Sequence, residues 1–296
     1  MIRIVGDLIL DEYWYGSTTR ISPEAPVPIV NLDRKETRLG GVGNVYNNIR
    51  AINPFDLDFA CYVDQKAFEL LPMFEDNPPR CFEADKIPLK IRILSEGHYM
   101  SRVDDEDWIK ETQLEEEVWD SVNVMKEDIV VLSDYNKGSI KNPLEFISKT
   151  KAKVIVDPKL SLDNYKGAYV CTPNKKEFES YIGPWATPKE LINKAALTRD
   201  HLELNYLIVT LGSEGVLLIG DTIEHYDATQ QEVYDVTGAG DTFVAGLALS
   251  VDKGLTISQA TIIANRLAGI SVGHNGTYII TDEDWEKSSE NIINRP

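Results

Sequence analysis

Short apolar runs rich in β-branched residues recur along the chain and predict buried strands. Strands of a parallel sheet are covered on both faces, so they are apolar at consecutive positions rather than at alternating ones. These runs are Ile2–Val5, Leu57–Val63, Ile129–Leu132, Val154–Val156, Ala168–Cys171, Leu207–Leu211 and Val216–Ile219. Stretches with helical character alternate with them, at 114–125, 175–181, 238–251 and 257–268. The alternation predicts an α/β fold, with helices covering both faces of a mostly parallel sheet.

Two stretches depart from this pattern. Pro26–Leu39 and Pro88–Val103 alternate polar and apolar residues without a helical period, which is typical of strands with one face in solvent. We expect them to form a small antiparallel β lid, at about residues 13–39 and 88–107, inserted into a single domain of residues 1–296. Ligands of open α/β sheets bind outside the carboxyl ends of the strands, so a lid there would exclude water from the site.

Composition and charge narrow the classes of function. The chain has 296 residues, 43% of them hydrophobic, and a net charge of −18, which opposes non-specific binding to nucleic acid or anionic lipid. No apolar run is long enough to cross a bilayer, and the first residues lack the pattern of a signal peptide. Cys61, Cys81 and Cys171 are too widely spaced for a zinc motif or a disulfide framework. We therefore expect a cytoplasmic protein whose partners are small molecules, not nucleic acids or membranes.

The segment Asp235–Thr242 (DVTGAGDT) carries the strongest chemical signal. Its small residues allow a tight turn before a helix, whose free N–H groups and positive dipole end attract an anion. Asp241 lies at the edge of this anion hole. It could be a general base that takes a proton from a hydroxyl attacking a phosphate. Equally, Asp241 or Thr242 could simply cap the helix, and the pattern alone leaves both roles open.

Two further motifs follow predicted strands. Thr210, Gly212 and Gly215 form a T-x-G-x-x-G turn that would let a nucleotide approach the backbone, although an ordinary strand–turn–strand has the same pattern. Asn174 and Glu177 form an N-x-x-E motif. Glu177 could hold hydrated Mg²⁺ between phosphates, because this ion keeps several waters and takes few protein ligands. The same spacing is also that of a helix capping box.

A third group of polar and glycine residues lies near the N-terminus. Asp11 and Asn44 could hydrogen-bond sugar hydroxyls, and Gly40 and Gly41 would leave room for a ring. A plain turn at the start of a helix explains the glycines equally well. They are not a dinucleotide fingerprint, because Tyr46 stands where its third glycine would fall.

These motifs, in this order over essentially the whole chain, resemble those of the ribokinase-like (PfkB) family of carbohydrate kinases. Gly40–Asn44 and Asp235–Asp241 are similar to the two signatures of that family. Finer likenesses to the D-glycero-D-manno-heptose-7-phosphate kinases lie at Trp14–Gly16, Arg20–Pro28 (RISPEAPVP), Lys90–Ser95, Leu132–Gly138, Asp157–Lys159 and Thr172–Asn174. The resemblance implies a ribokinase-like three-layer α/β/α fold that carries the β lid.

The resemblance also implies a reaction, the ATP-dependent phosphorylation of the anomeric hydroxyl of heptose 7-phosphate to the 1,7-bisphosphate. A kinase of the same fold for another sugar, sugar phosphate or nucleoside is the alternative. A noncatalytic sugar-phosphate-binding protein is a third possibility, which the intact Gly238, Gly240 and Asp241 argue against.

Roles for individual residues follow from the resemblance by position. Asp241 is the catalytic base, and the turn of small residues around it is the anion hole. The implied sets are Gly238, Ala239 and Gly240 for the hole, Asn174, Glu177, Thr210, Gly212, Gly215 and Asn275 for ATP and Mg²⁺, and Asp11, Gly40, Gly41 and Asn44 for the sugar. Glu177 would hold the Mg²⁺ through water.

Basic residues and apolar lid positions lead to two further expectations. Arg92, Arg102 and Lys159 are candidates for the substrate phosphate, since guanidinium grips phosphate bidentately and ammonium acts as a point charge; solvated surface charge is the alternative. Apolar lid residues would be buried if two lids packed together, which predicts a homodimer. These residues are Val27, Ile29, Ile91 and Ile93.

Overall fold

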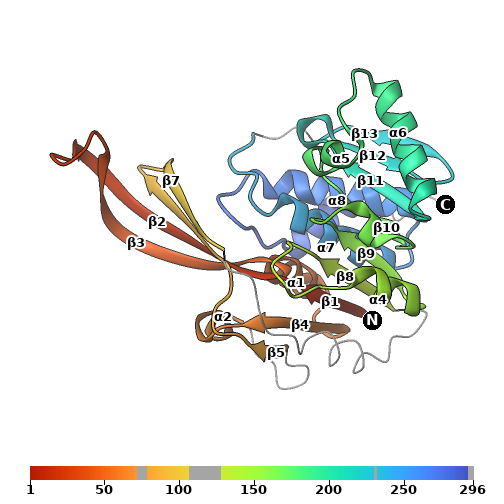
Figure 1. Cartoon of the computed structure of the whole chain (residues 1–296), viewed down its shortest axis with the longest axis horizontal. Helices are drawn as coiled ribbons and strands as arrows, with labels where there is room; N and C mark the ends of the chain where they lie inside the picture. The colour runs from red at the N-terminus through yellow and green to blue at the C-terminus, as the bar shows by residue number, and fades with distance from the viewer. Residues whose placement is uncertain (72–78, 107–127, 230–231, 293–296) are drawn as a thin grey trace.

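The main body is built around one large sheet, and the computed structural model describes residues 1–71, 79–106, 128–229 and 232–292 (Figure 1). Across the sheet the strands are β13 (Ile223–Tyr226), β12 (Val216–Ile219), β11 (Tyr206–Thr210), β10 (Val170–Cys171), β9 (Lys153–Asp157), β8 (Ile129–Ser133), β1 (Ile2–Gly6), β4 (Leu57–Val63) and β5 (Arg80–Glu83). Neighbours from β11 to β5 pair in parallel, and β11, β12 and β13 pair antiparallel. This confirms the predicted mostly parallel sheet.

Burial explains why the central strands could be predicted. All five residues of β8 are buried, so both faces of the sheet are covered there and consecutive positions must be apolar. The two edge strands, β5 and β13, have no such run, because their residues are half-buried or exposed. The sequence pattern therefore missed both edge strands.

The helices pack around this sheet. They are α1 (Val42–Ile52), α2 (Gln65–Leu70), α4 (Pro143–Lys149), α5 (Lys175–Ile182), α6 (Pro188–His201), α7 (Ala239–Asp252), α8 (Ile257–Ser271) and α9 (Asp282–Ser289), with short 3₁₀ turns η1 (Leu162–Tyr165) and η2 (Gly212–Glu214). Helix α7 contacts strands β1, β8 and β9 as well as helices α1 and α8, so every residue from Asp241 to Val251 is buried. The helices predicted at 175–181, 238–251 and 257–268 are confirmed. The one predicted at 114–125 lies outside the described residues.

A second sheet forms the lid and extends away from the body (Figure 1). Its strands, in spatial order, are β3 (Pro28–Gly41), β2 (Leu8–Ile21), β6 (Leu89–Ser95) and β7 (His98–Asp105). The outer pairs are antiparallel, but β2 and β6 are parallel, so the lid is not antiparallel throughout. Strand β2 also begins earlier than the predicted lid boundary. Its first six residues are buried against the core, and its last three are exposed.

Cation–π pairs support the exposed part of the β2–β3 hairpin. The Arg34 guanidinium lies 3.8 Å from the ring centroid of Tyr15, and the Lys35 ammonium lies 3.8 Å from that of Trp14. Each pair joins residues directly opposite each other in the register, where cross-strand side chains interact most strongly. The hairpin is thus stabilised without a hydrophobic core of its own.

None of the helices in the described parts of the chain has both the length and the hydropathy needed to cross a membrane.

Candidate active site

The start of α7 places a buried carboxylate beside a glycine turn. Gly238 is the N-cap of the helix and has a left-handed backbone with φ of 78°, a conformation that glycine adopts at little cost. A Cβ at this position would lie 2.6 Å from Nδ2 of Asn44. Asp241 follows in the first turn and is 2% exposed. Asp241 is not the N-cap, since Gly238 is, and its carboxylate oxygens accept from Asn44 and Tyr135.

Two donors from distant segments hold the Asp241 carboxylate. Nδ2 of Asn44 on α1 donates to Oδ2 at 3.0 Å, and the hydroxyl of Tyr135, which follows β8, donates to Oδ1 at 2.7 Å. Burial raises the pKa of Asp241 to about 7, while these two hydrogen bonds oppose the shift. A carboxylate that titrates near neutral pH can accept a proton and release it again, as a general base must.

Backbone amides at the same helix start are the candidates for the predicted anion site. The N–H groups of the first turn of a helix have no acceptor within the helix. The Ala239 N–H already donates to the Val236 carbonyl at 3.3 Å. Gly240 faces open space, since a Cβ there would meet nothing within 4 Å. Of the predicted anion-hole residues, Gly240 is therefore the best placed to receive an anion.

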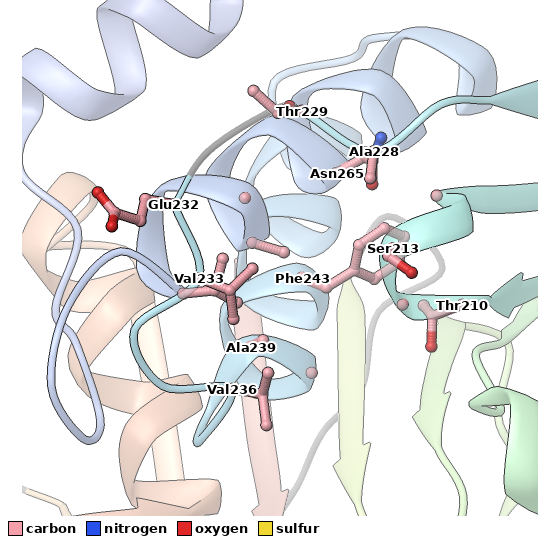
Figure 2. A pocket seen from close by; sticks show the side chains of 16 residues that line it. Thr210, Ser213, Ala228, Thr229, Glu232, Val233, Val236, Ala239, Phe243 and Asn265 are labelled. Carbon is pink, nitrogen blue, oxygen red and sulfur yellow. The ribbon is translucent and has the colours of Figure 1, made fainter. Parts of the chain in front are cut away.

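An adjacent cavity of about 840 Å³ has the size of a small-molecule site. Figure 2 shows Thr210 and Ser213 on one side of it, and Val236 and Ala239 on another. Gly215 lies where a Cβ would be 2.0 Å from the Tyr226 carbonyl, so only glycine permits the turn to approach so closely. The predicted residues Thr210, Gly212 and Gly215 all line this cavity.

Asn275 is not among the residues that line this cavity. Its side-chain amide donates to the Tyr15 hydroxyl at 3.3 Å, and its carbonyl accepts from Arg38 at 2.6 Å, so it contacts the lid strands instead. Asn265 on α8 lines the cavity in its place, with its amide donating to the Asp227 carbonyl at 2.8 Å. Because residues 257–268 include several polar side chains, no signal in the sequence singled out Asn265.

A smaller cavity, of about 220 Å³, continues from the glycine turn. Thr210 and Gly240 line both cavities, so the two meet at the anion site. The smaller cavity is also lined by Asn174 and Glu177. Oε2 of Glu177 accepts the Asn174 N–H at 2.9 Å, and Oδ1 of Asn174 accepts the Glu177 N–H at 3.0 Å, which confirms the capping box. The box orients Glu177 without removing it from the cavity.

Lys159, a candidate for the substrate phosphate, lines the smaller cavity. Its ammonium pairs with Oε1 of Glu177 at 2.7 Å. Asp157 lies in the same cavity, where burial and the charges of Asp241 and Glu177 raise its pKa well above the usual range. The residues at this end therefore provide several carboxylates and one cation close to the anion site.

The chemistry of these donors bears on a metal ion. Among the described residues there is no group of three or more His, Cys, Asp or Glu side chains that could hold one. Both oxygens of Glu177 already have partners. This arrangement fits hydrated Mg²⁺, which keeps its waters and binds mainly to nucleotide phosphates, and it fits no all-protein metal site.

The predicted sugar residues lie on the lid side of Asp241. Asp11 and Arg92 form a buried ion pair, with 2.5 Å between Oδ1 and Nη1. Gly40 makes room for this pair, since a Cβ there would lie 2.1 Å from Oδ2 of Asp11. Gly41 has a φ of 56° and ends the long lid strand β3 just before α1, whose Asn44 holds the carboxylate. The structure thus brings the N-terminal motif and the Asp235–Asp241 motif together.

A third cavity, of about 400 Å³, lies between the lid and the core. Its lining includes Arg92, Tyr99, Arg102 and Asp235. The Tyr99 hydroxyl on β7 donates to Oδ2 of Asp235 at 2.6 Å, which connects the lid to the core. Arg102 is more than half exposed and pairs only with its neighbour Asp104 among the contacts described for it, so it is accessible to a ligand.

Fold and site together define a class of protein. A buried carboxylate, a helix start that attracts anions, a large cavity on one side and a polar cavity under a β lid on the other are the parts of an enzyme that transfers a phosphoryl group between two bound substrates. The profile of the pfkB family carbohydrate kinases matches residues 112–284. The chain belongs to this family, so it is an ATP-dependent sugar kinase.

Two relatives are similar to almost the whole chain. "Bifunctional protein HldE" of Hahella chejuensis is 37% identical over 301 residues, which are 97% of this chain and 63% of that protein. The protein of the same name from Pseudomonas fluorescens is 38% identical over 303 residues, with the same two shares. The chain thus spans somewhat less than two thirds of the length of these relatives.

Solved structures agree on the fold. Phosphofructokinase-2 from Escherichia coli superposes with a TM-score of 0.82 at 16% identity, covering 99% of both chains. Ribokinase from Thermotoga maritima superposes with a TM-score of 0.77 at 20% identity, covering 98% of this chain and 99% of its own. The fold is therefore ribokinase-like.

Proposed function

We propose that the protein phosphorylates the anomeric hydroxyl of D-glycero-D-manno-heptose 7-phosphate, with ATP and Mg²⁺, to give the 1,7-bisphosphate. The observation that carries the chemistry is that Asp241 directly follows Gly240, which lines both the nucleotide-sized cavity and the smaller cavity, while Asn44 and Tyr135 hold its carboxylate. The HldE relatives and the RISPEAPVP segment favour a heptose phosphate over other sugars.

In the proposed reaction, Asp241 accepts the proton of the anomeric hydroxyl as that oxygen forms its bond to the γ-phosphorus. The bond from this phosphorus to the bridging oxygen of ADP breaks. The amides at the start of α7, the Gly240 N–H among them, stabilise the negative charge of the transferring group. The base and the anion site follow each other in the first turn of one helix, so their relative position is rigid.

The nucleotide and the sugar phosphate would contact two different sets of residues. Thr210, Gly212 and Gly215 would contact the nucleotide, and the capping box at Asn174–Glu177 would lie beside its phosphates. Mg²⁺ would neutralise part of the phosphate charge there. At the sugar end, the Asp11 carboxylate would accept hydrogen bonds from hydroxyls, and the Asn44 amide would donate to them or accept from them. Arg102 would pair with the phosphate, because its guanidinium is exposed.

A panel of sugars tests the substrate assignment. We expect coupled ADP-release assays to give turnover with heptose 7-phosphate and at least about tenfold lower kcat/KM with the same heptose lacking the phosphate, because a charge-assisted hydrogen bond to phosphate would be lost. Equal values for both sugars, or preference for ribose, fructose 6-phosphate or a nucleoside, would refute the heptose 7-phosphate assignment and leave the kinase chemistry intact.

We also propose that the protein is a homodimer joined through the lid. The hairpin of β2 and β3 extends from the body (Figure 1) and exposes Ile21, Val27 and Leu32, each by about half or more. Apolar side chains on a projecting sheet are covered when a second lid packs on it. Of the other apolar lid residues expected at this interface, Ile29, Ile91 and Ile93 are half-buried within one chain.

Light scattering coupled to size exclusion tests the dimer. We expect a mass of twice the 33.3 kDa chain. Changing Val27 and Leu32 to Lys should convert it to the mass of one chain, because unpaired charges would be buried in the interface. A single-chain mass for the unchanged protein at the concentration of the activity assay would contradict the proposal.

A further inference from the structure

Tyr135 contacts the base of the reaction although no part of the reaction above uses it. It follows β8 in the LSDYNKG segment, and its hydroxyl donates to Oδ1 of Asp241 at 2.7 Å. Oδ2 of the same carboxylate accepts from Asn44 at 3.0 Å. Each oxygen of Asp241 thus has one protein donor, and each keeps a lone pair with which it can accept a further proton. The two contacts together set the plane of the carboxylate.

The loop that carries Tyr135 is itself held by a buried carboxylate. Asp7 at the end of β1 is fully buried. Its Oδ2 accepts the N–H groups of Tyr135 and Lys137, each at 2.9 Å, and its Oδ1 accepts that of Ser139 at 2.9 Å. Three hydrogen bonds from backbone N–H groups to one carboxylate fix the backbone of the loop. The tyrosine hydroxyl is therefore presented to Asp241 from a rigid support.

We propose that Tyr135 is a positioning residue of the phosphoryl-transfer reaction, whose hydroxyl holds the Asp241 carboxylate in its plane and in its charged form. The inference rests on the proposed role of Asp241 as the base. It assigns to Asp7 the task of holding the loop, and it explains why a tyrosine stands beside a carboxylate that takes its proton from a different hydroxyl.

The tyrosine is suited to donate and not to react. Burial and the charge of Asp241 raise the pKa of Tyr135 well above its ordinary value, so the phenol keeps its proton. A donor to the charged form of a carboxylate lowers its pKa, so Tyr135 counteracts the burial that raises the pKa of Asp241 to about 7. The other charged groups facing this carboxylate act in both directions, since Asp11 and Asp157 oppose its ionisation and Lys90 favours it.

The variant Tyr135→Phe tests the inference through the pH profile of kcat/KM, which reports the ionisation of the free enzyme. We expect the acid limb, the pH range in which kcat/KM falls as the base becomes protonated, to shift by about one unit to higher pH, because a hydrogen bond to a charged group is lost. At a pH below this range kcat/KM should be about tenfold lower than in the unchanged protein, and at a pH above it kcat/KM should be nearly the same. A protein in which Tyr135 only filled space would keep the limb unchanged.

Tyr278→Phe is the matched control. The Tyr278 hydroxyl also donates to a carboxylate, Oδ2 of Asp284, at 2.8 Å, beyond the lining of the three cavities. The same substitution there removes the same kind of bond and should leave the acid limb in place. An equal shift in both variants would overturn the inference.

A ring-fluorinated tyrosine at position 135 covers the case in which Tyr135→Phe does not fold. Fluorine makes the phenol a stronger donor with almost no change of shape, so the acid limb should move downward, opposite to the effect of phenylalanine. An unchanged limb with the fluorinated residue would refute the inference.

Asp241→Asn separates the two proposals. If that variant kept full turnover, Asp241 would not be the base, and both the proposed reaction and the role of Tyr135 would fail. If Asp241→Asn were inactive while neither change at position 135 moved the limb, only the role of Tyr135 would fail.

Discussion

Asp241→Asn should lower kcat by about three orders of magnitude, within the range that general bases contribute. The asparagine side chain has nearly the same shape and still accepts from one of the two donors, but it cannot take up a proton. Nucleotide affinity, measured by calorimetry, should change by less than about threefold, because the cavity lined by Thr210 and Gly212 is separate from the carboxylate. Stopped-flow or coupled assays give kcat.

The control for this prediction lies at the other end of the same helix. Asp252 is the last residue of α7, and its carboxylate faces the N-terminal ammonium at 3.6 Å, away from the cavities. Asp252→Asn should leave kcat unchanged.

Since Asp241 ionises with a pKa raised to about 7, the rate of the unchanged protein should fall as the pH drops through about 7 and the base becomes protonated. A profile that stays flat down to about pH 5 would contradict the role of Asp241.

Gly238→Ala should reduce kcat/KM by about 10- to 100-fold. The left-handed backbone at this position strains any residue with a Cβ by about 1–2 kcal/mol. The added methyl would also lie 2.6 Å from the Asn44 amide, so the hydrogen bond to Oδ2 of Asp241 has to lengthen or break. Loss of a bond to a charged group adds about 1.5–3 kcal/mol, part of which appears in the transition state.

Gly254→Ala isolates the strain from the clash. Gly254 follows the C-terminus of α7, has the same φ of 78°, and a Cβ there would meet nothing within 4 Å. Both variants should therefore lower the melting temperature through backbone strain, and only Gly238→Ala should lose activity. Equal activity losses would show that helix stability, and not the geometry around Asn44 and Asp241, controls the rate.

Some of the site could be predicted because its parts are neighbours in the sequence. The glycine turn, the helix start and Asp241 all lie within Asp235–Thr242, so local backbone rules are enough to bring them together. The turn at Thr210–Gly215 and the capping box at Asn174–Glu177 are likewise local, and both form where they were expected. Local motifs of this kind depend on hydrogen bonds between residues only a few positions apart.

The partners of Asp241 could not be predicted in this way. Tyr135 is 106 residues from Asp241 and Asn44 is 197 residues from it, and no local rule links them. They meet because α7 packs against both β8, which Tyr135 follows, and α1, which carries Asn44. The same reasoning covers Lys159, whose partner Glu177 lies on helix α5, and Asn275, whose side chain reaches Tyr15 on the lid.

The amino-acid sequence by itself determined the central strands, the buried helices and the glycine turn at the start of α7. Hydrophobic periodicity and short-range backbone geometry depend only on nearby residues. The tertiary structure alone decided the parallel pairing of β2 with β6, the edge strands β5 and β13, and the two donors that hold Asp241. Those features depend on which segments become neighbours when the sheet assembles, and this order is set by the packing of the whole chain.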